Sequence, residues 1–324
     1  MTTQASRGRP VSLVIGSGGL LGKALTKHID SSRTPIVLPE RIHWGDHSKA
    51  LTTLVAASTE TVRLASGKEW NIFWCAGAGT TGTTQETFNR EIALLEEYIH
   101  TLTGILSPTE LSNGAFFYAS SAGAIYAGSS GQPFTEHTKP HSLSPYGDTK
   151  IKCERIVKSL PDSAVTVAIG RISNLYGPGQ DLRKAQGLVS KLCLSYHTGD
   201  ITEMFVSLDT LRDYIYVADA ASLVFDFLTL ARETYPGQST TKIIASGHSM
   251  SIAEVLGTAK TILKRPLPLV RISSRQTKQQ ARDLRFNSVV LPELNARYFR
   301  SFPSGFLATN NDIGMRFRKA NLTN

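Results

Sequence analysis

The chain has 324 residues, 41% of them hydrophobic, and a formal net charge of +9, which suits one large globular domain or two closely packed lobes. No apolar run approaches the roughly 18 residues that a membrane-spanning helix needs. The basic charge comes without a zinc-finger spacing, a continuous basic helix or interleaved aromatic and basic residues, so neither a membrane nor a nucleic acid is expected as a partner. The cysteines, Cys75, Cys153 and Cys193, are too scattered for a disulfide framework or a zinc site and predict a reducing, cytoplasmic location.

Short apolar runs alternate with longer segments of helical spacing along the first half of the chain. This alternation predicts βαβ units, and hence an α/β fold with a doubly wound parallel sheet of the Rossmann type. The expected strands are Val11–Ile15, Pro35–Leu38, Asn71–Cys75, Ala115–Ser120 and Val165–Arg171. The expected helices are a first one that follows residues 16–22 and runs to about Ile29, then Leu51–Ala65, Glu86–Leu106 and Tyr146–Leu160.

The pattern loosens after about residue 172, where Tyr176–Gln180 is rich in glycine and proline. The remaining elements are then expected as strands at Ile215–Val217 and Lys242–Ala245 and helices at Ala220–Ala231 and Ser251–Leu263. Basic, irregular sequence occupies the rest of this half.

Two units follow from this change of pattern. We expect a dinucleotide-binding Rossmann domain over residues 1–172, to which residues 214–245 return. Residues 173–213 and 246–324 are expected to form a smaller C-terminal α/β lobe that binds the substrate.

A glycine-rich turn connects the first strand to the first helix. Gly16, Gly19 and Gly22 have a Gly-x-x-Gly-x-x-Gly spacing. The first glycine permits a tight turn, the second lets the backbone approach a pyrophosphate, and the third allows close helix–strand packing at a helix N-terminus that attracts anions. The triplet alone is a weak signal, and a purely structural turn is the alternative, but this strand–turn–helix context predicts dinucleotide binding.

The end of the second strand bears on the choice of cofactor. An acidic residue there usually holds the ribose 2′-hydroxyl of NAD, whereas an arginine accommodates the 2′-phosphate of NADP. Glu40 and Arg41 supply one of each. Arg41 favours NADP, with NAD as the alternative cofactor and a solvent-facing loop position as the alternative for this arginine.

Tyr146 and Lys150 form a Tyr-x-x-x-Lys pair, and residues four apart on a helix share one face. A free tyrosine has a pKa near 10, and a nearby cation lowers that pKa toward the range useful for proton transfer. Ser120 and Ser121 follow a strand, at the sheet edge where ligands bind in open parallel sheets. A solvated helix face and ordinary turn chemistry explain the separate pieces, but their order favours a catalytic centre.

Further motifs follow one another in a set order along the chain. Besides the glycine turn, they are Cys75–Ala78, Asn89, Tyr118–Tyr126, Ser144–Lys150, Arg171–Pro178 and Arg212–Asp219. Together they resemble the extended short-chain dehydrogenase/reductases, the NAD-dependent epimerase/dehydratase family, over about residues 11–260. Because that family acts largely on nucleotide sugars, the resemblance implies a Rossmann enzyme with a nicotinamide cofactor and such a substrate.

The resemblance also implies a role for each matched residue. Tyr146 would be the acid/base, Lys150 would lower its pKa and hold the nicotinamide ribose, and Ser121 would hydrogen-bond the reacting oxygen. Ser120 is the alternative hydroxyl, because the loop before Tyr126 is one residue longer than the usual pattern. The expected cofactor-binding residues are Gly16, Ser17, Gly18, Gly19, Leu20, Leu21, Gly22, Arg41, Ala76, Gly77, Ala78, Asn89, Tyr146 and Lys150.

Two residues of the second half would bind the substrate by the same resemblance. Asn174 would contact its sugar or diphosphate, and Arg212 would pair with the diphosphate, which a guanidinium fork suits. The alternative for Arg212 is an internal salt bridge with Asp213 or Asp219.

Departures from the family's subtypes narrow the reaction. Ala122–Ile125 contains no carboxylate where the sugar dehydratases carry an Asp-Glu pair, and Ala124 and Gly179 replace the groups of the epimerising GDP-sugar reductases. We therefore expect an NADP(H)-dependent ketoreductase of a nucleotide-activated deoxysugar, with an NAD-dependent nucleotide-sugar 4-epimerase as the close alternative. A non-catalytic dinucleotide-binding Rossmann protein is less favoured, because such proteins usually lose the tyrosine or the lysine. The resemblance leaves a homodimer open. No metal is expected, because no carboxylate–histidine cluster joins His43 and His47.

Overall fold

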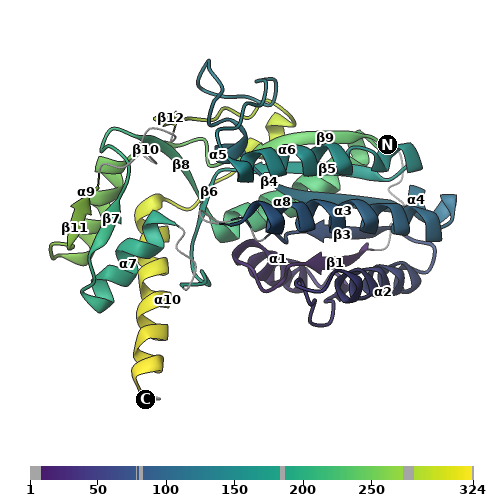
Figure 1. The fold of residues 1–324 in the computed structure, drawn as a ribbon, viewed down its shortest axis with the longest axis horizontal. Coiled ribbons are helices and arrows are strands. Elements are labelled where there is room, and N and C mark those ends of the chain that lie inside the picture. The colour runs from purple at the N-terminus through teal and green to yellow at the C-terminus, as the bar shows by residue number, and fades with distance from the viewer. Residues whose placement is uncertain (1–8, 78, 80–82, 183–186, 273–280, 323–324) are drawn as a thin grey trace, which may run out of the picture.

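The computed structural model describes residues 9–77, 79, 83–182, 187–272 and 281–322. Its larger unit is built on six parallel strands in the order β2-β1-β3-β4-β5-β9 (Figure 1). The doubly wound parallel sheet expected from the sequence is therefore present. Its strands are β1 (Val11–Ile15), β2 (Ile36–Val37), β3 (Trp70–Trp74), β4 (Gly114–Ser121), β5 (Thr166–Ile172) and β9 (Ser239–Ile244).

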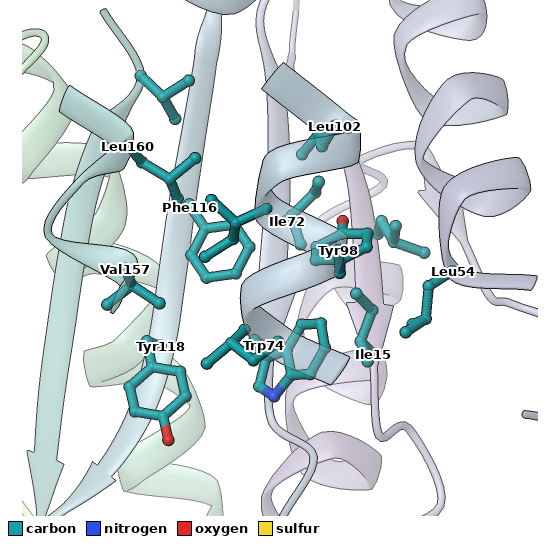
Figure 2. Packing of buried hydrophobic residues seen from close by; sticks show 14 of the residues in the cluster. Ile15, Leu54, Ile72, Trp74, Tyr98, Leu102, Phe116, Tyr118, Val157 and Leu160 are labelled. Atoms are coloured by element: carbon teal, nitrogen blue, oxygen red, sulfur yellow. The ribbon is translucent and has the colours of Figure 1, made fainter. Parts of the chain in front are cut away.

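Helices cover both faces of this sheet. On one face the core contains Trp74, Tyr98 and Phe116, all at most 2% exposed, beneath α2, α3 and α6 (Figure 2). On the other face α1 and α8 enclose a second core around Val14, Leu25 and Phe227. The helices of this unit are α1 (Leu20–Ser31), α2 (His47–Ala65), α3 (Gln85–Ile105), α4 (Pro108–Ser112), α5 (Ala122–Ile125), α6 (Pro145–Val157), the 3₁₀ turn η1 (Leu160–Ser163) and α8 (Val217–Thr234).

The strand order places the candidate site residues at one edge of the sheet. The glycine turn follows β1, Cys75–Gly77 follows β3, and Ser120 and Ser121 end β4. Because all of these strands are parallel, these segments meet at the same carboxyl edge. The chain leaves β1 for the face of α1 and leaves β3 for the face of α3, so the ligand-binding switch point of a doubly wound sheet lies between β1 and β3.

The β2 side of the sheet is reduced. In the dinucleotide-binding order 3-2-1-4-5-6, a third strand lies outside the second. Among the strands that the structure describes, none pairs with the outer side of β2, and the chain runs from β2 directly into α2. β2 itself spans Ile36–Val37, shorter than the expected Pro35–Leu38, because Pro39 lacks an N–H for the ladder and no outer strand supports an extension.

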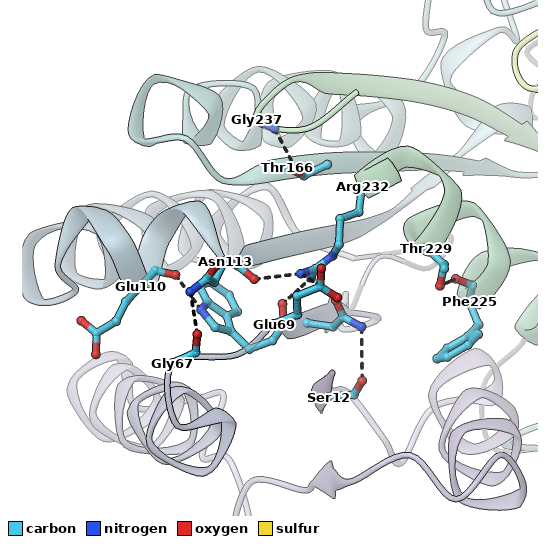
Figure 3. Close-up of polar contacts among 12 residues, drawn as sticks. Ser12, Gly67, Glu69, Glu110, Asn113, Thr166, Phe225, Thr229, Arg232 and Gly237 are labelled. Atoms are coloured by element: carbon cyan, nitrogen blue, oxygen red, sulfur yellow. Dashed lines mark hydrogen bonds and ion pairs between the residues drawn. The ribbon is translucent and has the colours of Figure 1, made fainter. Parts of the chain in front are cut away.

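Arg232 of α8 forms hydrogen bonds at the opposite edge of the sheet, where the strands begin (Figure 3). Its guanidinium donates hydrogen bonds to the carbonyl oxygens of Asn113 at 2.8 Å and Trp70 at 2.6 Å, and also to the Asn71 side chain. Glu69 lies 3.7 Å from the same guanidinium. The start of β3 and the residue before β4 are thus tied to one helix, far from the glycine turn.

The outer edge of β9 is covered by a later segment of the chain. The buried Lys242 ammonium donates to the Ser288 hydroxyl at 2.7 Å, the Val290 carbonyl at 2.7 Å and the Asn295 side chain at 2.8 Å. Glu136 accepts from the Ile243 backbone N–H at 2.8 Å. The contacts of Lys242 attach residues 288–295 to the Rossmann unit, and Glu136 occupies one N–H at the outer edge of β9.

A smaller lobe lies beside the carboxyl edge and has its own core around Leu192, Val255 and Phe306 (Figure 1). Its central sheet runs β10-β8-β12, with β6 also paired to β8, and β11 pairs with β7. The strands are β6 (Asn174–Tyr176), β7 (Thr202–Met204), β8 (Leu211–Tyr216), β10 (Ser249–Ser251), β11 (Leu269–Arg271) and β12 (Asp283–Leu284). The helices after residue 173, apart from α8, are α7 (Leu188–Thr198), α9 (Ile252–Leu263), the 3₁₀ turn η3 (Pro292–Asn295) and α10 (Phe302–Leu322).

The limits of the two units differ in detail from those expected. The return to the Rossmann unit begins at α8, later than residue 214, because residues 214–216 complete β8 in the small sheet. Within the segment 246–324 expected for the lobe, Leu291 and Leu294 instead pack into the core beneath α1 and α8. Among the helices that the structure describes, none is both long and apolar enough to cross a lipid bilayer.

Candidate active site

The glycine turn has no room for side chains at two of its positions. Gly16 has a φ of +86°, and a Cβ built on it would lie 2.6 Å from the Ala76 backbone nitrogen. A Cβ on Gly22 would lie 2.1 Å from the Gly16 carbonyl oxygen. These glycines therefore let β1, the β3 end and α1 meet closely. A Cβ on Gly18, in contrast, would face open space with no atom within 4 Å.

The N-terminus of α1 is suited to an anion. Gly19 caps the helix without a side-chain hydrogen bond, and no acidic residue stands in the first turn. The first N–H groups of a helix lack internal partners and lie at the positive end of its dipole. Leu20 and Leu21 offer only such backbone groups here, since Leu21 is buried in the core. The residues present thus fit the pyrophosphate of a dinucleotide.

We expect Gly22→Ala to weaken dinucleotide binding by at least about tenfold and to lower the melting temperature, because its methyl group would force α1 away from the turn. Gly257→Ala in α9 is the matched control, since its methyl group meets no atom and the residue lies outside the glycine turn. Fluorescence titration with NADPH and thermal melting measure the two effects. Native affinity in the Gly22 variant would contradict the role assigned to this turn.

The other residues expected to hold the cofactor lie in different surroundings. Ala76 touches Gly16, and Gly77 lies directly over Lys150. Arg41 is exposed in the loop after β2. Asn89 is exposed on α3 and accepts a hydrogen bond from Gln85 at 3.0 Å. Ser17 is half-buried in the turn, and Ala78 lies outside the described residues.

Tyr146 and Lys150 occupy one face of α6, as their spacing predicts. The helix begins at Pro145, with the Ser144 hydroxyl accepting from the Gly147 N–H. The Lys150 ammonium lies 5.8 Å from the centre of the Tyr146 ring and is almost completely buried. The Tyr146 ring is half-buried and packs against Phe88 of α3, with 6.3 Å between ring centres. The phenol is therefore placed at the surface of the site, with the cation behind it.

Lys150 is held by two oxygens that the sequence did not single out. Its ammonium donates to the Tyr118 hydroxyl at 3.1 Å and to the Glu91 carboxylate at 3.4 Å. Burial by itself lowers the pKa of Lys150, but the oxygens of Tyr118, Tyr146 and Glu91 outweigh it and raise that pKa well above its ordinary value. Lys150 therefore remains a cation throughout the neutral range.

Tyr118 lies beneath the site and does not line it. Its side chain has no solvent exposure, and burial raises its pKa well above the ordinary value. It therefore contacts Lys150 as a neutral phenol. The available signal was weak, since Tyr118 looks like any aromatic residue of a central strand. Glu91 was easier to find, because it shares the apolar face of α3 with Phe88 and Leu95.

The two candidate hydroxyls at the end of β4 point into different environments. Ser120 is buried and donates to the Glu154 carboxylate at 2.6 Å. Ser121 is half-buried and caps α5, where its hydroxyl accepts from the Ala124 N–H at 3.4 Å. Because its hydroxyl has only one long hydrogen bond and is partly exposed, Ser121 is better placed than Ser120 to contact a substrate oxygen.

Ser120 belongs to a buried ionic network behind the site. Arg171 of β5 donates to both oxygens of Glu154 of α6, at 3.0 and 2.7 Å, and also to the Tyr126 hydroxyl. Both charged side chains are at most 6% exposed. The network joins β4, β5 and the helix that carries Tyr146.

The expected substrate residues lie together in the smaller lobe, on paired strands. Asn174 of β6 donates to the Asp213 carbonyl of β8 at 2.8 Å, beside Arg212. The Arg212 guanidinium donates to the Leu211 carbonyl at 2.8 Å, and within the described part of the chain no carboxylate forms an ion pair with it. Burial lowers the pKa of Arg212. The partly buried guanidinium thus keeps donors available for a ligand.

The alternative salt bridges for Arg212 do not form. Asp213 accepts hydrogen bonds from the hydroxyls of Ser173 at 2.7 Å and Ser246 at 3.0 Å. Asp219 accepts from the Arg300 backbone N–H at 2.7 Å. Both carboxylates have other partners.

The chain is similar to known proteins in sequence and in fold. Residues 12–239 match the NAD dependent epimerase/dehydratase family. The dTDP-4-dehydro-6-deoxyglucose reductase of Escherichia coli is 32% identical over 146 residues, which are 44% of this chain and 43% of that protein. The chain is thus matched to less than half the length of this curated relative.

Two solved structures share the fold over nearly the whole chain. The UDP-glucose 4-epimerase of Thermotoga maritima superimposes with a TM-score of 0.75 and 20% identity, covering 96% of this chain and 99% of that one. RMD from Pseudomonas aeruginosa, complexed with NADPH, has a TM-score of 0.72 and 20% identity, covering 95% and 99%.

Proposed function

The chain belongs to the NAD dependent epimerase/dehydratase family, and on that premise we propose that it is an NADP(H)-dependent ketoreductase of a nucleotide-activated deoxysugar. The observation that carries the proposal is the half-buried Tyr146 backed by the buried Lys150 ammonium, next to a glycine turn that fits a pyrophosphate. The similarity to a dTDP-4-dehydro-6-deoxyglucose reductase supports reduction of a keto sugar as the reaction.

In this reaction Tyr146 is the proton donor. A bound NADPH would supply the hydride for the carbonyl carbon of the sugar. The Tyr146 hydroxyl gives its proton to the carbonyl oxygen, and the Lys150 ammonium stabilises the phenolate that remains. The Ser121 hydroxyl donates a hydrogen bond to the same oxygen and so stabilises the negative charge that develops on it. The product is the corresponding alcohol.

Arg212 and Asn174 support a diphosphate-bearing substrate. The Arg212 guanidinium is partly buried, and the charge of Asp283 and the Leu211 carbonyl offset only part of its desolvation, so an anionic group of a substrate would stabilise it further. Asn174 lies on the adjacent strand and its side-chain carbonyl can accept from a sugar hydroxyl. A homodimer and a cytoplasmic location remain predictions.

Cofactor choice is the first test. We expect the purified protein to release little dinucleotide on heating and to bind NADPH more tightly than NADH in a fluorescence titration. Arg41→Gln is expected to cost about tenfold in NADPH affinity with little effect on NADH, because one charged hydrogen bond to the 2′-phosphate is lost. Arg33→Gln, at the other end of β2, is the matched control.

The catalytic test follows with 4-keto nucleotide sugars, where consumption of NADPH absorbance reports reduction. Tightly held NAD, weak NADPH binding and interconversion of 4-epimers would show that the protein is the epimerase and not the reductase. Dinucleotide binding without turnover of any such sugar would favour a non-catalytic role.

A further inference from the structure

A carboxylate next to the catalytic cation is the feature of this site that the proposed reaction does not use. Glu91 of α3 lies 3.4 Å from the Lys150 ammonium, and the two side chains are 13% and 4% exposed. Both approach the same glycine: a Cβ on Gly77 would lie 3.0 Å from the Lys150 nitrogen and 3.2 Å from a Glu91 oxygen. Glu91, Lys150 and the end of β3 are thus packed around one point.

Burial makes this ion pair different from the others on the same helix. Glu86 and Arg90 of α3 also pair, but their side chains are 73% and 58% exposed, so water and salt screen the interaction. The charge of Glu91 is screened much less and acts on its neighbours over several ångströms. The groups around Lys150 are Tyr118 of β4, Tyr146 and Cys153 of α6, and Glu91 of α3.

The two charges have opposite effects on a phenolate at Tyr146. The Lys150 ammonium stabilises it, and the Glu91 carboxylate, 3.4 Å from that ammonium, opposes it. Glu91 also limits where the long lysine side chain can go, since the ammonium is held between Glu91 and Tyr118.

We propose that Glu91 is a positioning residue that acts through Lys150: it fixes the ammonium behind Tyr146 and offsets part of its charge, and thereby sets the pH range in which Tyr146 transfers a proton. The proposal rests on the proposed function for the role of Tyr146. It predicts a tyrosine that stays protonated, and able to act as a donor, to higher pH than the lysine alone would allow.

Glu91→Gln tests this directly, because the amide keeps an oxygen for the Lys150 hydrogen bond and removes only the charge. We expect the midpoint of Tyr146 ionisation to fall by about one pH unit. The ultraviolet absorbance of tyrosinate, taken as the difference between each protein and the same protein carrying Tyr146→Phe, isolates this residue and needs no substrate. Glu96→Gln, at an exposed position of the same helix, is the matched control and should leave the midpoint unchanged.

An unchanged midpoint in a folded Glu91→Gln protein would overturn the proposal. Glu91→Asp keeps the charge, so its midpoint of Tyr146 ionisation should stay close to that of the native protein. This variant provides the test if Glu91→Gln is not stably folded. With a keto sugar that the protein reduces, the pH at which the reduction rate falls on the alkaline side should shift by the same amount as the spectroscopic midpoint. Failure to reduce any nucleotide sugar would remove the proposed function and leave the titration result standing.

Discussion

Tyr146→Phe is expected to lower the rate of carbonyl reduction by about 10²–10⁴-fold, the range for loss of a general acid. The phenyl ring keeps its packing against Phe88, so the fold and the binding of the dinucleotide should stay near native. Single-turnover oxidation of NADPH with a 4-keto nucleotide sugar measures the rate, and fluorescence titration measures the binding.

Tyr118→Phe is the control that makes this result specific. Tyr118 is the phenol that Lys150 hydrogen-bonds at 3.1 Å, but it is fully buried and cannot reach a substrate. Its variant should lose far less activity than the Tyr146 variant, because Lys150 keeps its contact with Glu91. Near-native reduction by the Tyr146 variant, or a larger loss at Tyr118 than at Tyr146, would show that another group delivers the proton.

Arg171→Met is expected to destabilise the protein by about 3–5 kcal/mol, because it leaves the Glu154 carboxylate buried with the Ser120 hydroxyl in place of its bidentate cation. Chemical denaturation followed by circular dichroism measures the change in the free energy of unfolding. The double variant Arg171→Met with Glu154→Met should recover much of that loss, since two apolar side chains leave no unpaired charge.

Arg63→Met provides the exposed counterpart. Arg63 pairs with Glu60 at 2.6 Å, but the side chains are 67% and 44% exposed. Its removal should leave the unfolding curve indistinguishable from that of the native protein. Equal, small effects at Arg171 and Arg63 would mean that the buried network does not stabilise the fold.

The sequence predicted most accurately those parts in which local pattern and tertiary structure agree. Val11–Ile15 is β1 as expected, because a strand buried on both faces reads as a nearly continuous apolar run, here interrupted by Ser12 alone. Helix α8 was expected at Ala220–Ala231 and spans Val217–Thr234. Its ends shifted by a few residues, because helix ends depend on capping and are hard to read from periodicity.

The parts that escaped prediction depend on partners distant in the chain. Strand β6 has three residues and exists only because it pairs with β8. Helix α10, at Phe302–Leu322, was not expected, since its basic and polar residues obscure the apolar positions, such as Phe306, that pack on the lobe. Likewise, the spacing of Tyr146 and Lys150 was visible along one helix, whereas the contact of Lys150 with Glu91 joins residues from two helices.

The two outer strands of the six-stranded sheet also determine how the protein behaves at high concentration. An exposed edge strand offers free N–H and C=O groups to a second chain and is a route to aggregation. Here β2 has only Ile36–Val37 between Pro35 and Pro39, too short and too poor in N–H donors to template another strand. At the other edge the Ile243 N–H is already taken by Glu136. The short β2 and the capped Ile243 N–H thus both disfavour strand-by-strand growth into fibres from this parallel sheet.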